Sequence, residues 1–518
     1  MIRLGVLLFV LLIGRAQADP ISNGPVGLGF DPVLTTEVYA TALAFMAPRT
    51  LEPVPVSQLV VWGLRGLTAL DPSLGAELRD GKLRLLRNGR PVFETPTPRD
   101  EDPRGWALSG ATLSAAAAAT SVDVRQAGTQ GVIQNFFDEV FNHLDPYSRY
   151  VAPIEAGEDR ERRIGRAGIG LTVARRGAAV VAETVIGDGP AALIGIRPGD
   201  AILSIDAQST RGRDAATVAR WLSGPEDTTL TVAWRGRDGR VRKEEFTRVM
   251  VPPDSVFAQR IGDMLVVRVT GFNTNTDLQL TRTLQDGLTG PHPPAGLVLD
   301  LRGNRGGLLR QAVIAADALL PPGVIAFTAG RDPAADHVWR SGGRELGQDM
   351  PVVVVVDGRT ASAAEVLAAA LADRGRAVVV GSSTLGKGLV QTIAPLPDGG
   401  ELFVTWSRVL APRLWPIQGL GVLPQVCSSL GLEALRTQLA ALALGEQPME
   451  RAILAQRAAR APLPPAQVLA LRAPCPAAEG RDFDMEAARV LIDNPAAYAA
   501  ALLPPLMDSA QTSAAPMR

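Results

Sequence analysis

The spacing of hydrophobic residues changes along the chain and divides it into regions. From Thr35 to Leu70, and again from Gly131 to Leu144, apolar positions recur at helical spacing. From 168 to 249 the pattern changes to short β-type runs between Gly, Pro and Asp turns, with one helix near 215–222. We therefore predict a mostly helical N-terminal region followed by a small β-rich domain.

Beyond Pro252, apolar strand runs alternate with helical runs. The strand runs are 264–269, 296–300, 352–356 and 376–380, and the helical runs are 308–320 and 362–372. Such alternation is typical of a largely parallel sheet covered by helices. After Val426 the chain is Ala/Leu-rich at helical spacing, and it ends in a polar tail from Asp508 that we expect to be disordered. The predicted fold class is multidomain α/β.

Composition excludes several classes of protein. The 518 residues are enough for about three or four domains, and 52 Lys and Arg against 53 Asp and Glu leave no basic field for nucleic-acid binding. The 46% hydrophobic and 20% charged residues exclude a mostly disordered chain or a multi-span membrane protein. With three histidines and no HExxH or CxxC spacing, no metal site is expected.

The first residues have the three regions of a secretory signal in order. Arg3 precedes an apolar run from Leu4 to Ile13, and Ala16-Gln17-Ala18 supplies small residues for cleavage. An uncleaved anchor is the alternative, but crossing a bilayer takes roughly 20 apolar residues and this run has about half that number. We expect residues 1–18 to be removed after Ala18, the protein to be periplasmic or secreted, and no stable membrane span to remain.

Both cysteines, Cys427 and Cys475, lie in the last hundred residues. An exported chain reaches a compartment in which thiols can pair, so a disulfide between them is expected. Two buried free thiols are the alternative.

The segment from 352 to 391 contains the strongest candidate chemistry. A buried strand run ends before Ser362, which opens a helix, and a second strand run leads to Lys387. In α/β folds, ligands bind where strands end and helices begin. A simpler interpretation of Ser362 is a helix cap, because Glu365 three residues later completes a capping box.

A phosphate-binding loop is a second interpretation of the lysine segment. Gly381 to Lys387 has the spacing of such a loop, but position 388 is Gly where a Mg²⁺-binding hydroxyl is required. Residues 389–393 have the pattern of a strand rather than of the helix that receives phosphates. A nucleotide site is therefore not expected, and no cofactor is expected.

Short motifs occur in order between about 130 and 426. They are Leu144-Asp145-Pro146-Tyr147-Ser148, Val269–Asn273, Asp300–Gly307, Thr360–Glu365, Gly386-Lys387-Gly388, Gln391 and Gly421–Pro424. Together they resemble those of the carboxyl-terminal processing peptidases, also called tail-specific proteases. The resemblance implies a catalytic dyad of Ser362 and Lys387 with Gln391 nearby.

The implied dyad is chemically sound. A serine hydroxyl is a poor nucleophile until a base takes its proton, and with no histidine in either motif the neutral amine of Lys387 can do so. Burial would have to lower the lysine pKa from about 10.4 toward about 7 to 8. We expect Gln391 to share one strand face with Lys387 and to orient the amine. Ala363 and the turn of Gly306 and Gly307, which resembles the family's second donor, are the expected oxyanion donors.

A second resemblance concerns the β-rich region. Gly168-Ile169-Gly170-Leu171, together with Gly189 to Asp200, resembles a PDZ domain placed ahead of the catalytic core. PDZ domains take an extended peptide as an added strand and hold its carboxylate with backbone N–H groups of a glycine-rich loop. Gly168, Ile169, Gly170 and Leu171 are the expected loop, and the helix near 215–222 would wall the pocket. The alternative is that these glycines only form turns.

Three single positions and one stretch depart from the family pattern, the stretch being Leu414-Trp415, where Gly and small polar residues are common. Arg305 stands where a proline is usual, Asp357 where an asparagine is usual, and Gln425 where an aspartate is usual. None belongs to the dyad, so the departures concern the substrate groove and the loop geometry. The residues after Val426 match no family motif.

The sequence therefore predicts an exported serine endopeptidase that recognises C-terminal tails through a PDZ domain and cleaves through an acyl-enzyme. The expected domains are 19–165 (mostly helical), 166–251 (PDZ), 252–426 (α/β catalytic core) and 427–518 (helical, with the tail). Expected partners are proteins or peptides with free C-terminal tails, and an adaptor protein is a further candidate. The competing hypothesis is a non-catalytic PDZ scaffold with a degenerate peptidase core.

Overall fold

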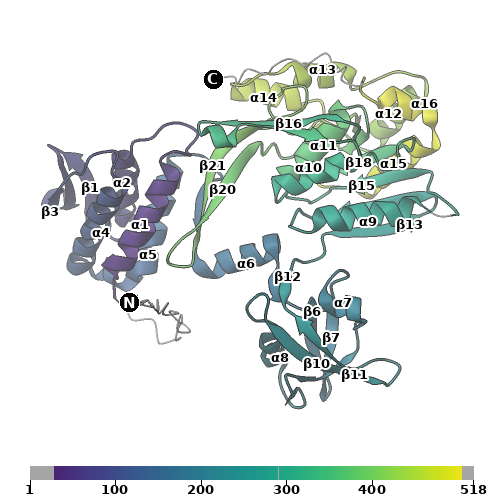
Figure 1. Ribbon diagram of the computed structural model, residues 1–518. Helices are drawn as coiled ribbons and strands as arrows, with labels where there is room; N and C mark the ends of the chain where they lie inside the picture. The colour runs from purple at the N-terminus through teal and green to yellow at the C-terminus, as the bar shows by residue number, and fades with distance from the viewer. Residues whose placement is uncertain (1–28, 290, 505–518) are drawn as a thin grey trace, which may run out of the picture.

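The computed structural model describes residues 29–289 and 291–504. The expected signal peptide and the polar tail from Asp508 lie outside these residues. Figure 1 shows an N-terminal helical region, a small β-rich unit and a larger α/β unit that includes the C-terminal helices. This is the multidomain α/β fold that the sequence predicts. None of the described helices combines the length and hydrophobicity that crossing a bilayer requires.

The N-terminal region is mostly helical, as expected, but it also contains an unexpected sheet. Its helices are α1 (Pro32–Met46), α2 (Val56–Arg65), α3 (Leu67–Leu70), α4 (Pro103–Thr120) and α5 (Val122–Asn142). The sheet is antiparallel, with strands β1 (Leu74–Arg79), β2 (Lys82–Arg87) and β3 (Arg90–Pro96). Its two turns, Asp80-Gly81 and Asn88-Gly89, have positive φ at every residue, which is the signature of tight hairpins. The signal for this sheet was therefore present in the sequence.

The β-rich unit is a sheet in the order β11-β10-β8-β7-β6. Its strands are β6 (Leu171–Arg176), β7 (Ala179–Val185), β8 (Ala201–Ile205), β9 (Gln208–Ser209), β10 (Thr229–Arg235) and β11 (Val241–Thr247), and its helices are α7 (Pro190–Ile194) and α8 (Ala215–Leu222). A ribbon of β5 (Arg166–Gly168) and β12 (Val249–Val251) connects the unit to the rest of the chain. Strand β6 is at the edge of the sheet and α8 packs beside it, which leaves a strand edge for pairing.

A six-stranded sheet forms the centre of the α/β unit, in the order β13-β14-β15-β18-β19-β22. Its strands are β13 (Val256–Ile261), β14 (Met264–Val269), β15 (Gly296–Asp300), β18 (Val352–Val356), β19 (Val378–Gly381) and β22 (Val426–Cys427). All neighbours from β14 to β22 are parallel, and only β13 is antiparallel to its neighbour. The largely parallel sheet is therefore confirmed, and its parallel strands end at one common edge.

Helices cover both faces of this sheet, which explains its continuous apolar strands. Residues such as Leu299 and Val354 pack against α9 (Thr276–Leu288), α10 (Leu309–Asp317) and α11 (Ala363–Asp373). The intervening residues, such as Val298 and Val353, pack against α12 (Leu432–Ala443), α15 (Asp482–Asp493) and α16 (Pro495–Ala501). Helices α13 (Glu450–Ala458) and α14 (Pro465–Arg472) follow α12 in the chain. The C-terminal helices are thus part of the α/β unit, and α12, α15 and α16 form a layer on one face of its sheet.

A second, antiparallel sheet joins the α/β unit to the N-terminal region. Its order is β17-β16-β21-β20, and β4 (Arg149–Val151), which precedes α6 (Pro153–Ile164), also pairs with β21. The other strands are β16 (Gly323–Gly330), β17 (His337–Ser341), β20 (Leu389–Pro395) and β21 (Glu401–Leu410). Leu402 and Val404 of β21 belong to the same hydrophobic core as Phe137 of α5. The hairpin that follows Lys387 is therefore anchored in the N-terminal region.

A disulfide joins Cys427, at the end of β22, to Cys475. Both side chains are buried. The bond ties the central sheet to the segment between α14 and α15 and encloses 48 residues. In the chain-entropy model, closing a loop of that length stabilises the fold by roughly 4 kcal/mol.

Candidate active site

Ser362 lies between β18 and α11. It is the N-cap residue of α11, with φ 56° and ψ −121°, a backbone conformation that residues with a side chain adopt only under constraint. Strain of this kind at a strand-to-helix turn occurs where a nucleophile is projected from the end of a sheet. The side chain of Ser362 lines a cavity at this edge of the sheet.

Glu365 does more than complete the helix cap that the sequence suggests. Its side chain is fully buried, and the carboxylate accepts the N–H of Ser362 at 2.7 Å. The same carboxylate accepts the N–H of Gly386 at 2.6 Å, the N–H of Lys387 at 2.8 Å and the hydroxyl of Thr384. Glu365 therefore joins two segments. One is the turn between β18 and α11 that contains Ser362 (357–362), which we call the serine turn, and the other is the loop between β19 and β20 that contains Lys387 (382–388), which we call the lysine loop.

Burial and hydrogen bonding act on the Glu365 carboxyl in opposite directions. Burial raises its pKa, whereas the bonds from Thr384 and from the N–H groups of Gly386, Ser362 and Lys387 lower it. The carboxylate form satisfies all of these donors at once. The role of Glu365 was missed in the sequence, although a glutamate on an otherwise apolar helix is itself a signal, because a buried carboxyl needs partners.

Lys387 lies in the loop between β19 and β20, and its amine is shielded from solvent on one side. The Nζ atom is 4.8 Å from the centre of the Tyr147 ring, which belongs to one of the sequence motifs. Burial lowers the pKa of Lys387 from the ordinary lysine value, the charge of Arg149 lowers it further, and Asp145 and Glu365 oppose the shift. A lowered pKa increases the fraction of neutral amine, which is the form that a general base requires.

Gln391 lies near Lys387, but the expected shared strand face is wrong. Strand β20 begins at Leu389, so Lys387 precedes it, and the pairing with β21 shifts between Val390 and Gln391. This irregularity breaks the alternation of faces on which the expectation depended. The Gln391 Nε2 atom donates to Leu389 O at 3.0 Å and to Thr405 Oγ1 at 3.1 Å. These bonds leave the amide oxygen as the group that can accept from an amine.

One of the expected oxyanion donors, Gly306, is also wrong. The N–H of Gly306 donates to Asn304 Oδ1 at 2.8 Å, so Gly306 is not available to an oxyanion. Gly307 and Ala363 line the cavity beside Ser362, whereas Gly306 does not. Gly306 instead permits close approach: it has φ 93°, and a Cβ there would lie 2.8 Å from the Ser362 Cβ. Gly307 and Ala363 are the candidate donors that the geometry favours.

One cavity of about 500 Å³ brings the candidate groups together. It is lined by Ser362, Ala363, Gly307, Lys387 and Gln391. Aromatic and aliphatic side chains form much of the remaining wall, among them Leu308, Trp339, Val390, Phe403 and Trp406. Within residues 29–289 and 291–504, no three His, Cys, Asp or Glu side chains are grouped to hold a metal ion.

The expected carboxylate-binding loop, Gly168-Ile169-Gly170-Leu171, lies at the junction of β5 and β6. Gly170 has φ 77°, and a Cβ there would come within 3.0 Å of Gly189, so the chain turns tightly at this point. A Cβ on Gly168 would be 3.6 Å from Leu222 O at the end of α8. The loop therefore leads into the edge strand β6 beside α8, as a peptide-binding role requires.

Comparison with known proteins defines the class of this chain. Residues 263–427 match the model of Peptidase family S41, and residues 181–236 match that of the PDZ domain. The first match includes the serine turn and the lysine loop, and the second does not include residues 168–171. The protein is a serine-type peptidase with a PDZ domain.

Individual relatives define the family. The chain is 33% identical over 305 residues to the carboxy-terminal-processing protease of Bartonella bacilliformis, which covers 57% of this chain and 69% of that protein. It is 32% identical over 320 residues to the chloroplastic C-terminal processing peptidase of Tetradesmus obliquus, and this match covers 57% of this chain and 67% of that protein. A solved photosystem II D1 C-terminal processing protease is 29% identical, with a TM-score of 0.33 over 59% of this chain and 86% of that one. The chain belongs to the carboxy-terminal-processing protease family, as its motifs indicated.

Proposed function

We propose that this peptidase is an endopeptidase in which Ser362 is the nucleophile and Lys387 is the general base. One observation carries the proposal: a single cavity holds a serine at a strained helix N-terminus and a lysine whose pKa is lowered. The alternative of a degenerate scaffold requires that one of these groups be absent or displaced. Both are present, and Glu365 binds the backbone of each.

The proposed reaction has two acyl-transfer steps. The Ser362 hydroxyl attacks the peptide carbonyl carbon while its proton moves to the Lys387 amine, and the N–H groups of Gly307 and Ala363 stabilise the oxyanion. The intermediate then collapses to an acyl-enzyme as Lys387 returns the proton to the leaving amine. Water attacks the ester by the same route, with Lys387 again taking and returning a proton. These groups suffice for peptide hydrolysis without a cofactor.

We further propose that the PDZ domain binds the C-terminal tail of a substrate protein and presents the chain to the cavity. The edge strand β6 beside α8 supports this role, because an antiparallel peptide added to β6 would end at residues 168–171. The domain ranges given above and export with removal of residues 1–18 are part of the same proposal.

Cleavage of one unfolded protein with different tails tests this function. A tail ending in Ala-Ala should be cleaved with a KM at least about tenfold below that of the same tail amidated or ending in Asp-Asp, because only the first offers both a terminal carboxylate and an apolar side chain. Leu171→Glu should raise the KM for the Ala-Ala tail in the same way and leave kcat unchanged, since the dyad lies in another unit. Equal KM values for all three tails would contradict tail selection by this loop.

A second prediction follows from the charges around the cavity. The residues that line it include Arg149, Arg163 and Arg305 but no Asp or Glu. In the described chain, Arg163 is paired with Glu401 and Arg149 with Asp159, whereas Arg305 is exposed and has no acidic partner. We expect peptides with Glu beside the scissile bond to be cleaved about fivefold faster than peptides with Lys there, because the local field favours negative charge.

The substitution Arg305→Ala should remove most of that difference, as measured by kcat/KM for the two peptides. Arg310→Ala is the matched control, since Arg310 is an exposed arginine of α10 that does not line the cavity. A preference that survives Arg305→Ala unchanged would show that Arg305 does not contribute to it.

A further inference from the structure

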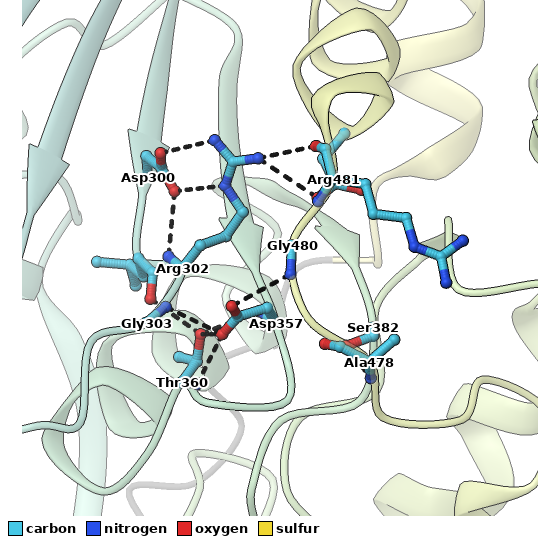
Figure 2. A network of polar contacts seen from close by, with 11 residues as sticks. Asp300, Arg302, Gly303, Asp357, Thr360, Ser382, Ala478, Gly480 and Arg481 are labelled. Atoms are coloured by element: carbon cyan, nitrogen blue, oxygen red, sulfur yellow. Dashed lines mark hydrogen bonds and ion pairs between the residues drawn. The ribbon is translucent and has the colours of Figure 1, made fainter. Parts of the chain in front are cut away.

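Three loops carry the groups of the proposed chemistry, and one other segment of the chain contacts all of them. The loops follow β15, β18 and β19 and contain Gly307, Ser362 and Lys387 respectively. The segment is 472–484, which runs from the end of α14 into α15 and which we call the C-terminal clamp. It lies beyond residues 263–427, the part that matches the peptidase family. Figure 2 shows the clamp beside the ends of these strands.

The lysine loop is bonded to the clamp at its first three residues. The hydroxyl of Ser382 donates to Ala478 O at 2.9 Å and accepts the N–H of Ala478 at 3.0 Å. The Ser383 hydroxyl donates to Cys475 O, and Arg472 donates to Thr384 O at 2.7 Å. The clamp therefore fixes the chain that leads from β19 to Lys387.

The serine turn is bonded to the clamp through Gly358 and Asp357. The N–H of Gly358 donates to Ala478 O at 2.7 Å. The Oδ1 atom of Asp357 accepts N–H groups of its own turn and of Gly303, and its Oδ2 atom accepts the N–H of Gly480 at 3.3 Å. Figure 2 shows this carboxylate between the turn and Gly480. An asparagine at position 357 could keep the Oδ1 bonds but could not accept from Gly480 as well.

The loop after β15 is bonded to the clamp through Arg302. Its guanidinium binds both oxygens of Asp300 at 2.9 Å and donates to Arg481 O at 2.9 Å and to Asp484 at 3.5 Å. Gly480 lies flat against the stem of Arg302, because a Cβ there would be 2.5 Å from the Arg302 Cδ. All three catalytic loops are thus held by one short segment, as Figure 2 shows for Arg302.

We propose that the C-terminal clamp is a positioning element for the peptidase reaction and that the Cys427–Cys475 disulfide holds it against the sheet. The proposal rests on the roles of Ser362 and Lys387 given above. Catalysis requires reacting atoms within about 3 to 3.5 Å of one another, and a displacement of 1 Å can cost about 100-fold in rate. Three loops from different strands keep such a geometry only if something fixes them relative to one another. The clamp does so mainly through its own backbone groups, and none of its residues lines the cavity.

Two substitutions loosen the clamp without touching the cavity. Ser382→Ala removes both bonds to Ala478, and Asp357→Asn removes the bond to Gly480 while keeping the turn. We expect each to lower kcat about tenfold and the double variant to lower it further, with KM changed less than about twofold. The pH profile of kcat should move to higher pH, because a looser loop hydrates Lys387 and returns its pKa toward the ordinary value. Replacing both Cys427 and Cys475 by serine should have the same effects.

Tyr498→Phe is the matched control. Its hydroxyl accepts the N–H of Val352 at 2.9 Å and donates to Val352 O at 3.1 Å, so it binds a C-terminal helix to the other end of β18. This change should lower the melting temperature but leave kcat and its pH profile unchanged. If the clamp variants behave as Tyr498→Phe does, the clamp is merely structural and the proposal is overturned. A wild-type enzyme that cleaves no substrate would instead overturn the proposed function, so the two failures are distinguishable.

Discussion

Replacement of Ser362 or Lys387 by alanine should lower kcat by about 10³-fold or more and leave substrate binding intact. Either change removes a partner of one chemical step, so the double variant should be no slower than either single one. Lys387→Arg should be equally inactive, because a guanidinium keeps the positive charge but cannot act as a base near neutral pH. The measurement is single-turnover cleavage of an unfolded protein, with KM and the melting temperature recorded for each variant.

Thr392→Ala is a suitable control for these variants. Thr392 lines the same cavity but has no role in the proposed reaction, so its loss should change kcat by less than about threefold. Gln391→Ala should fall between the two cases, since Gln391 would orient the amine without carrying its proton. Clear proteolysis by purified Ser362→Ala enzyme would refute the assignment of the nucleophile.

Glu365→Gln should also lower kcat, by about 100-fold, although Glu365 touches no substrate atom. The two carboxylate oxygens accept from Thr384 and Gly386 on one side and from Ser362 and Lys387 on the other. A glutamine can accept on only one side, and its amide N–H groups then face donors on the other. Each buried donor left without an acceptor costs about 1 to 3 kcal/mol, so the serine turn and the lysine loop should separate.

Asp373→Asn is the control that separates the loss of kcat expected for Glu365→Gln from a general loss of stability. Asp373 is a fully buried carboxylate at the other end of α11, where it binds Arg457 at 2.8 Å and the Trp415 indole at 2.7 Å. Both substitutions should lower the melting temperature, but only Glu365→Gln should lower kcat in the enzyme that remains folded. Equal kcat values for the two variants would show that Glu365 does not position the dyad.

Local sequence patterns were sufficient for the class of fold and for the class of enzyme. The buried run 352–356 predicted a central strand because helices cover both faces of the sheet. Ser362 and Lys387 are the proposed dyad because the motifs that contain them resemble those of the carboxyl-terminal processing peptidases, whereas without that resemblance a helix cap is the simpler interpretation of Ser362. The unexpected sheet of β1 to β3 could have been found from its Asp-Gly and Asn-Gly turns.

The remaining parts of the site depend on contacts that no local pattern contains. Gly306 and Gly307 are adjacent glycines, and only the bond from Gly306 to Asn304 decides which of them is available to an oxyanion. The face of Gln391 depends on a bulge against β21, a partner strand that follows later in the chain. Ser382 and Ala478 are 96 residues apart, and the segment that contains Ala478 has no periodicity that would indicate its partner. Such contacts are determined by tertiary packing alone.

The most direct test of the Ser/Lys dyad is the pH dependence of labelling by a fluorophosphonate, with the modified residue located by mass spectrometry. At low pH the amine of Lys387 is protonated and cannot take the serine proton, so labelling should be slow and should rise with pH. We expect one adduct, on Ser362, formed at a rate that increases through an apparent pKa below the ordinary lysine value. Lys387→Ala should lose that pH dependence together with most of the rate. An adduct on another residue, or labelling of Lys387→Ala at the wild-type rate, would contradict the dyad.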